Sequence, residues 1–79
     1  RANDNDLGLC SYLYTNSMDK AHIGSEKLES GCVAVNTGVV AIAEAPFGGI
    51  KQTGYGREGG SGAIKDYLNV KYTHMGLKI

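Results

Sequence analysis

The sequence of 79 residues contains no tryptophan, one phenylalanine, one proline and only two cysteines. Its formal net charge at pH 7 is zero, because eight lysine and arginine residues balance eight aspartate and glutamate residues. Since no basic run or stripe is present, we expect no nucleic-acid partner. No apolar stretch approaches the roughly 18–20 residues that span a bilayer, and the first residues do not resemble a signal peptide, so we expect no membrane association.

Two cysteines are too few for a disulfide framework, and both Cys10 and Cys32 lie in apolar runs. Free cysteine is among the most buried residue types, so we predict two reduced core thiols in a cytoplasmic protein. His22 and His74 lie far apart, with no cysteine or carboxylate at metal-ligand spacing. The "NDND" run at residues 3–6 lacks the glutamate that closes a calcium loop. The sequence therefore predicts no metal site.

The first half of the sequence predicts a strand, a helix and a second strand. Residues 9–15, "LCSYLYT", alternate and are rich in aromatic residues, whereas residues 32–35, "CVAV", form the continuous apolar run of a strand buried on both faces. Between them, Asn16 or Ser17 can cap a helix, and Gly31 suits the left-handed position after its end. Since parallel strands need such a crossover, we predict a βαβ unit of an α/β fold with a parallel sheet.

The second half changes in character. Seven of the 12 glycines lie between residues 48 and 62, which predicts a long irregular loop. After it, Ser61 can cap a short helix that ends at Tyr67, and residues 68–77, "LNVKYTHMGL", alternate like a strand. This last strand and one face of the predicted sheet have no partner in the sequence. We therefore expect the chain to be part of something larger, completed by further sequence or by other chains.

The segment "GYGREG", residues 54–59, matches the G-x-G-x-x-G pattern of a dinucleotide-phosphate loop. A true fingerprint has a strand directly before it, a helix directly after it and an acidic residue about 20 positions further on. Here the polar, turn-like residues 49–53 come first, and the sequence offers no acidic residue at that later distance. The context excludes a phosphate loop, and we predict that the glycines serve positive φ angles and close backbone contacts.

Four segments, in order and spacing, resemble the C-terminal end of the aldehyde dehydrogenase superfamily: "RANDNDLGLCSYLYT", "SGCVAVNTG", "APFGGIKQTGYGREGG" and "DYLNVKY". Within it they resemble the succinate-semialdehyde dehydrogenase branch. The resemblance implies that residues 1–66 are the C-terminal part of a parallel-sheet catalytic domain and that residues 67–79 are an oligomerisation arm strand. It also implies a homo-oligomeric parent enzyme that oxidises a small aldehyde to the carboxylic acid with NAD or NADP, succinate semialdehyde being a candidate substrate.

The same resemblance assigns three residues to the substrate pocket. Phe47 matches the aromatic residue beside the catalytic pocket and the nicotinamide end of the cofactor. Val40 and Ala41 lie in the segment that resembles the lining of the aldehyde entrance. At Ala41 the semialdehyde branch typically has a serine that helps to hold the distal carboxylate of the substrate. Because alanine cannot donate that hydrogen bond, this departure puts succinate semialdehyde in doubt.

Four further residues are assigned by the resemblance to a subunit interface. Arg57 matches a family arginine that points toward a subunit interface. Asn69, Val70 and Tyr72 lie in the arm strand, which extends the sheet of a neighbouring subunit in the family. The family often has glutamate in place of Asn69, as a plausible ion partner for Arg57, whereas asparagine keeps only a hydrogen-bonding option.

No catalytic residue is expected in this chain. In the family the nucleophilic cysteine, the glutamate base, the oxyanion-hole asparagine and the cofactor domain lie upstream, and neither Cys10 nor Cys32 matches the nucleophile. The resemblance therefore implies a C-terminal fragment that is inactive alone and binds no cofactor by itself. The alternative is a truncated, self-associating interaction module without enzymatic activity.

Overall fold

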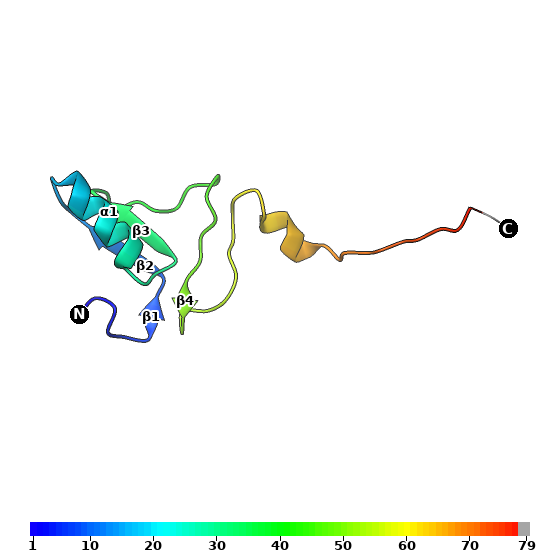
Figure 1. Cartoon of the computed structure of the whole chain (residues 1–79), viewed down its shortest axis with the longest axis horizontal. Coiled ribbons are helices and arrows are strands. Elements are labelled where there is room, and N and C mark those ends of the chain that lie inside the picture. Colours follow the sequence, from blue (N-terminus) through cyan, green and yellow to red (C-terminus); the bar gives the residue numbers. More distant parts are fainter. Residues whose placement is uncertain (78–79) are drawn as a thin grey trace.

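The structure, a computed structural model, describes residues 1–77. Along the chain it has two short strands before a helix, two strands after it and a terminal 3-10 helix (Figure 1). These elements are β1 (Leu7–Gly8), β2 (Cys10–Leu13), α1 (Met18–Lys27), β3 (Cys32–Val35), β4 (Ile50–Lys51) and η1 (Ala63–Tyr67).

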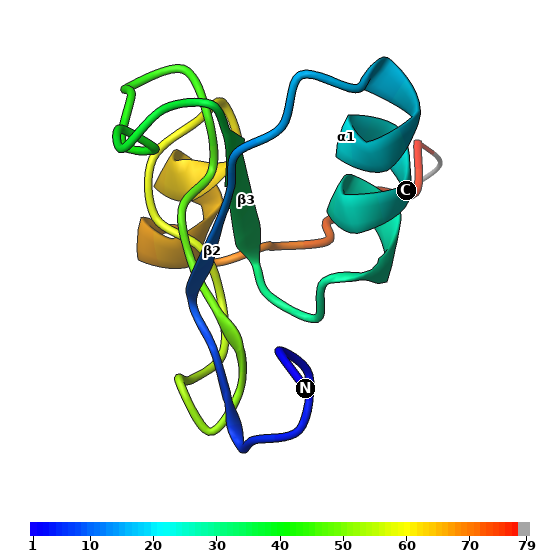
Figure 2. The same cartoon turned by 90° about the vertical axis from the view of Figure 1, so that its left-hand side faces the viewer.

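The predicted βαβ unit is confirmed. Strands β2 and β3 pair in parallel, with Cys10 opposite Cys32 and Leu13 opposite Val35, and α1 connects them. Figure 2 shows α1 on one side of this strand pair and the chain that follows β3 on the other. Helix α1 packs so closely on the pair that a side chain at Gly24 would collide with Leu13. Side chains alternate between the two faces of a strand, so the two cysteines face away from the helix.

Helix α1 begins as predicted but ends earlier. The Ser17 hydroxyl accepts a hydrogen bond from the backbone N–H of Lys20 at 3.3 Å, which satisfies one free donor of the first turn. The predicted left-handed cap at Gly31 is wrong, because the chain becomes extended at Leu28 and Gly31 has no positive φ. Gly31 is needed for a different reason. A side chain there would collide with the carbonyl oxygen of Gly48.

The glycine-rich half contains more structure than the predicted irregular loop. Strand β4 pairs antiparallel with β1, with Leu7 opposite Lys51. Further along, Phe47 and Glu58 form an isolated antiparallel bridge with N–O distances of 2.7 and 2.8 Å. The glycine-rich segment thus folds back on itself at the Phe47–Glu58 bridge. It is held to the segment directly before β2 by the pairing of β4 with β1.

The last segment departs from the prediction in one detail and leaves the other open. Helix η1 has Gly62 at its N-cap with no side-chain hydrogen bond, so the predicted cap by Ser61 is wrong. Residues 68–77 have no strand partner among the described residues and extend away from the rest of the molecule (Figure 1). Residues 78–79 of the predicted arm lie outside the described part.

The chain has almost no core of its own. Ala34 in β3, with 4% of its surface exposed, is the one buried hydrophobic residue in the described part. The accessible surface is 6955 Å². A compact protein of this mass would expose about 4,600 Å². The radius of gyration is 18.6 Å, against about 12 Å for a compact chain of this length. This excess of exposed surface is what a piece of a larger assembly should have.

Candidate functional site

The site begins where the chain leaves β3, at the carboxyl ends of the parallel strands. Asn36 has a φ of 59°, a conformation that asparagine tolerates better than most residues. Its side-chain oxygen accepts a hydrogen bond from the Thr15 N–H at 2.9 Å, and its amide donates to the Thr15 carbonyl at 3.0 Å. This pair of bonds fixes the exits of β2 and β3 together. Ligands of α/β sheets bind beyond this edge, so the next segment is a candidate binding loop.

Two of the three predicted pocket residues lie around one hollow. Ala41 and Phe47 line an open hollow of about 440 Å³, whose walls come from residues 41–47 and from the returning chain. Val40 is half-buried and is not among the described residues that line this hollow. The structure thus brings Ala41 and Phe47 together and leaves Val40 next to them along the chain.

Glu58 also lines this hollow, and the sequence analysis assigned it no role. Its backbone forms the bridge with Phe47, so its position is tied to that of the aromatic residue. The "GRE" of the glycine segment was a usable signal, since it placed a carboxylate two residues after Gly56. Phe47 also lines a second hollow of about 340 Å³, together with Arg57. Phe47 therefore borders two concave surfaces.

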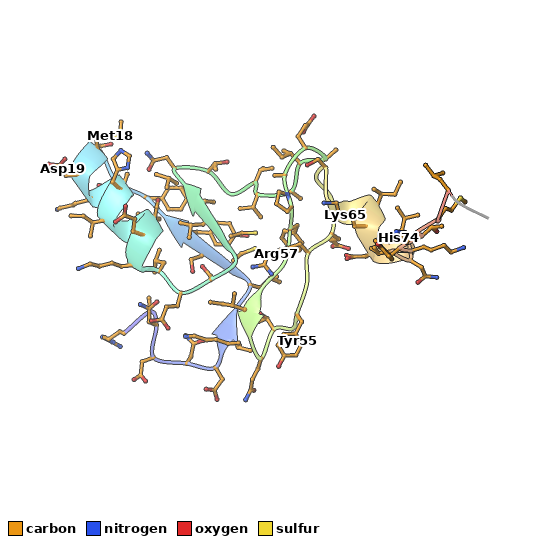
Figure 3. The ribbon with its side chains drawn as sticks, turned by 45° about the vertical axis from the view of Figure 1, so that its right-hand side comes forward. Met18, Asp19, Tyr55, Arg57, Lys65 and His74 are labelled. Carbon is orange, nitrogen blue, oxygen red and sulfur yellow. The ribbon has the colours of Figure 1, made fainter. Side chains whose placement is uncertain are left out.

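Arg57 binds within its own loop. Its Nη1 donates hydrogen bonds to the carbonyl oxygens of Gly49 at 2.9 Å and Gly56 at 2.8 Å. These charge-assisted bonds tie the two limbs of the glycine-rich segment together. Figure 3 shows Arg57 near the centre of the molecule and His74 far out on the C-terminal extension. Within this single chain, the hydrogen bonds of Arg57 go to these two carbonyl groups and not to Asn69.

The other predicted interface residues all lie on the extension. Asn69, Val70 and Tyr72 are exposed, and the Val70 side chain is 102% exposed, as it would be in an isolated extended chain. Residues 68–77 form no hydrogen-bond ladder in this structure. Their assignment to a subunit interface stays a prediction.

The glycines of "GYGREG" explain why the pattern arises without a phosphate site. Gly54, Gly56 and Gly59 have φ angles of 117°, 81° and 73°. A Cβ added at Gly54 or Gly56 would touch nothing within 4 Å, so conformation and not space requires glycine there. The next helix is η1, only five residues long, and it does not follow the pattern directly. The segment does not fit a dinucleotide pyrophosphate, which needs the start of a longer helix.

A lysine of β4 binds the backbone carbonyl groups of the N-terminal turn. Lys51 has a φ of 57°, and its Nζ donates to the backbone carbonyls of Asn3 at 3.1 Å and Asn5 at 3.2 Å. It also pairs with Glu29 at 2.9 Å. Because both partners are partly exposed, the ion pair itself contributes about 0–1 kcal/mol. The carbonyl groups of the "NDND" turn therefore hold β4 in place.

Both cysteines are free, but they are partly exposed and not fully buried as predicted. Burial and then the neighbouring Cys32 raise the pKa of the Cys10 thiol above its usual value. The Cys32 sulfur lies 3.9 Å from the carbonyl oxygen of Gly48. Within residues 1–77, no helix has the length and apolar character that crossing a membrane requires.

A parallel strand pair with its crossover helix, followed by a candidate binding loop and a glycine-rich segment, places the chain in the class of parallel α/β domains. Comparison with known sequences makes this specific: residues 1–73 match the aldehyde dehydrogenase family. The chain belongs to that family, which confirms the resemblance seen in the sequence.

Individual relatives agree with this assignment. The chain is 49% identical over 75 residues to a succinate semialdehyde dehydrogenase of Acinetobacter baylyi, covering 95% of this chain and 16% of that protein. It is 48% identical over 75 residues to a 3-sulfolactaldehyde dehydrogenase of Pseudomonas putida, covering 95% of this chain and 15% of that protein. A crystal structure of an aldehyde dehydrogenase from Brucella melitensis biovar abortus superposes with a TM-score of 0.84 at 48% identity, covering 90% of this chain and 15% of that one.

The chain spans about one sixth of the length of these relatives. Near-equal identity to enzymes named for two different aldehydes also means that identity alone does not select a substrate.

Proposed function

We propose that this chain is the C-terminal part of an NAD(P)-dependent aldehyde dehydrogenase that oxidises a small aldehyde with a distal acidic group to the carboxylic acid. Succinate semialdehyde is the first candidate substrate. The observation that carries the proposal is the hollow in the segment that follows β3, which Ala41 and Phe47 line together. Residues 1–66 belong to the catalytic domain in this proposal, and residues 67–79 form the arm.

Phe47 is proposed to form the wall between the aldehyde and the nicotinamide end of the cofactor. The two backbone hydrogen bonds to Glu58, at 2.7 and 2.8 Å, hold this aromatic residue in place before any ligand binds. A wall that is fixed in advance reduces the entropy cost of orienting a small, flexible aldehyde. Val40 and Ala41 complete the entrance on the other side.

Recognition of the acid end of the substrate needs hydrogen-bond donors that Ala41 does not supply. Ala41 offers a methyl group where the semialdehyde branch has a hydroxyl donor. An acidic group near Ala41 would therefore need its donors from parts of the enzyme outside this chain. The sequence similarity to a 3-sulfolactaldehyde dehydrogenase supports keeping other acid-bearing aldehydes as candidates beside succinate semialdehyde.

The arm is proposed to add a strand to the sheet of a neighbouring subunit in a cytoplasmic homo-oligomer. The support is that residues 68–77 leave the body of the molecule with apolar side chains exposed and without a strand partner among the described residues. Asn69, Val70 and Tyr72 then lie in the interface. The same exposed segment favours the second candidate, a self-associating module without enzymatic activity.

The two candidates differ in one assay. The purified chain of residues 1–79 should produce no NADH or NADPH from succinate semialdehyde above a buffer control under either proposal. The protein isolated from its source, at the length at which it is made, should reduce NAD or NADP with this aldehyde if it is the proposed dehydrogenase. Isolation of a short protein without this activity would favour the interaction module.

A further inference from the structure

Cys10 and Cys32 lie directly opposite each other on the parallel strands β2 and β3. Partners in register on adjacent strands have side chains on the same face and backbones about 4.8 Å apart. Disulfides join residues whose Cα atoms are about 4.4–6.8 Å apart. The spacing of the two backbones therefore falls within the Cα range of a disulfide.

The surroundings of the two thiols leave them available to each other. Both are free and partly exposed in the described part of the chain. They face away from α1, which packs against the Leu13 side of the sheet. The sulfur of Cys32 makes one weak contact, at 3.9 Å to the carbonyl oxygen of Gly48, and a disulfide can replace it at little cost. The neighbouring thiol is also one cause of the raised pKa of Cys10.

We propose that Cys10 and Cys32 are a reversible redox modification site, at which a low-molecular-weight disulfide oxidises the two thiols to one disulfide that joins β2 to β3. One cysteine thiolate attacks a sulfur of the oxidant, forms a mixed disulfide and releases one small thiol. The second cysteine then attacks the protein sulfur of that mixed disulfide and releases the other. Two protein S–H bonds are lost, one S–S bond forms, and the oxidant ends as two thiols that carry the two protons.

The modification has a defined structural consequence. The bond closes a loop that contains α1, so it restricts the unfolded chain and ties the two ends of the βαβ unit. It also removes the Cys32 sulfur from Gly48, the residue directly after Phe47. Oxidation therefore strengthens the sheet at the place where the proposed substrate loop is anchored.

Peptide mapping tests the proposal on the protein at the length at which it is made. The protein is reduced, transferred into oxidised glutathione under native conditions, quenched with acid, alkylated and digested with trypsin. Trypsin places the two cysteines on separate peptides, residues 2–20 and residues 28–51. We expect a linked pair of these peptides, lighter than their sum by two hydrogen atoms, that dithiothreitol separates. Its yield in native buffer should exceed its yield in guanidinium chloride at least tenfold.

Two variants provide matched controls. Cys32→Ser should abolish the linked peptides. The double variant Cys32→Val with Val33→Cys keeps the composition but moves the thiol to the opposite face, beside Ser11, and should reduce the linkage at least tenfold. Three results would overturn the proposal: equal linkage in this double variant, separate glutathione adducts on both cysteines without linkage, or linkage between two chains seen as a dimer on a non-reducing gel.

Discussion

Replacing Gly31 by alanine should destabilise the protein by about 2–4 kcal/mol. The added Cβ would collide with the carbonyl oxygen of Gly48 and would lie 2.7 Å from its carbonyl carbon and 3.0 Å from the Cα of Gly49. These are all backbone atoms, so no side-chain rotation relieves the overlap. Overpacking of this kind costs about 1–3 kcal/mol. The shift also stretches the 2.9 Å hydrogen bond from the Gly31 N–H to Gly8, which is worth about 0.5–1.5 kcal/mol.

Gly62→Ala is the matched control for this substitution. Gly62 has φ −90° and ψ −8°, which alanine adopts freely, and an added Cβ there meets nothing within 4 Å. We expect a neutral effect or a gain of about 0.4–1 kcal/mol from the smaller entropy of the unfolded chain. Urea unfolding of the protein that carries this segment, followed by circular dichroism, measures both. If the two variants agree within about 0.5 kcal/mol, the close contact between the start of β3 and the glycine loop is not present.

The remaining predictions concern the pocket, the arm and one thiol. In the full-length enzyme, Phe47→Ala should lower kcat/KM for the aldehyde at least tenfold, whereas Lys20→Ala, at an exposed position of α1 that lines neither hollow, should not. Lost thermal stability with unchanged kinetics would assign Phe47 to packing alone. Ala41→Ser should raise kcat/KM for semialdehydes with a distal carboxylate up to about tenfold, since a hydrogen bond to a charged group is worth about 1.5–3 kcal/mol. Equal gains for a small aliphatic aldehyde would refute the pocket assignment. Val70→Pro removes a backbone donor, so it should dissociate the oligomer in light scattering; a monomeric unmodified protein at tens of micromolar would contradict the arm. Because the pKa of Cys10 is raised, its thiolate fraction at pH 8 is below that of an ordinary thiol, and iodoacetamide should alkylate it more slowly than an ordinary cysteine thiol at that pH.

Local patterns were sufficient to predict the βαβ unit and its N-terminal cap. The apolar run of β3 and the alternation of β2 are each visible within a few residues, and Ser17 caps α1 through a contact only three residues away. The end of α1 was predicted too late because glycine has two uses. Gly31 permits a close contact with Gly48, 17 positions away in the sequence, and no local pattern distinguishes this use from a left-handed cap.

The glycine-rich half was harder to predict because its order depends on distant contacts. Strands β1 and β4 have two residues each, too few for a period, and they pair across more than 40 positions. The hollow forms only because Glu58 returns to Phe47, so the sequence identified the aromatic wall but not the carboxylate beside it. Residues 68–77 were recognised as strand-like, but a strand ladder needs a partner, and residues 1–77 do not supply one.

The length and activity of the native protein test the central proposal most directly. The protein is isolated from its source, its intact mass is measured, and it is assayed with succinate semialdehyde and either NAD or NADP. Since this segment matches 16% of the Acinetobacter relative, we predict a protomer several times the 8.3 kDa of this chain, with NAD(P)-dependent activity that residues 1–79 alone lack. A native protomer of 8.3 kDa, or a longer protein that oxidises no aldehyde, would contradict the account.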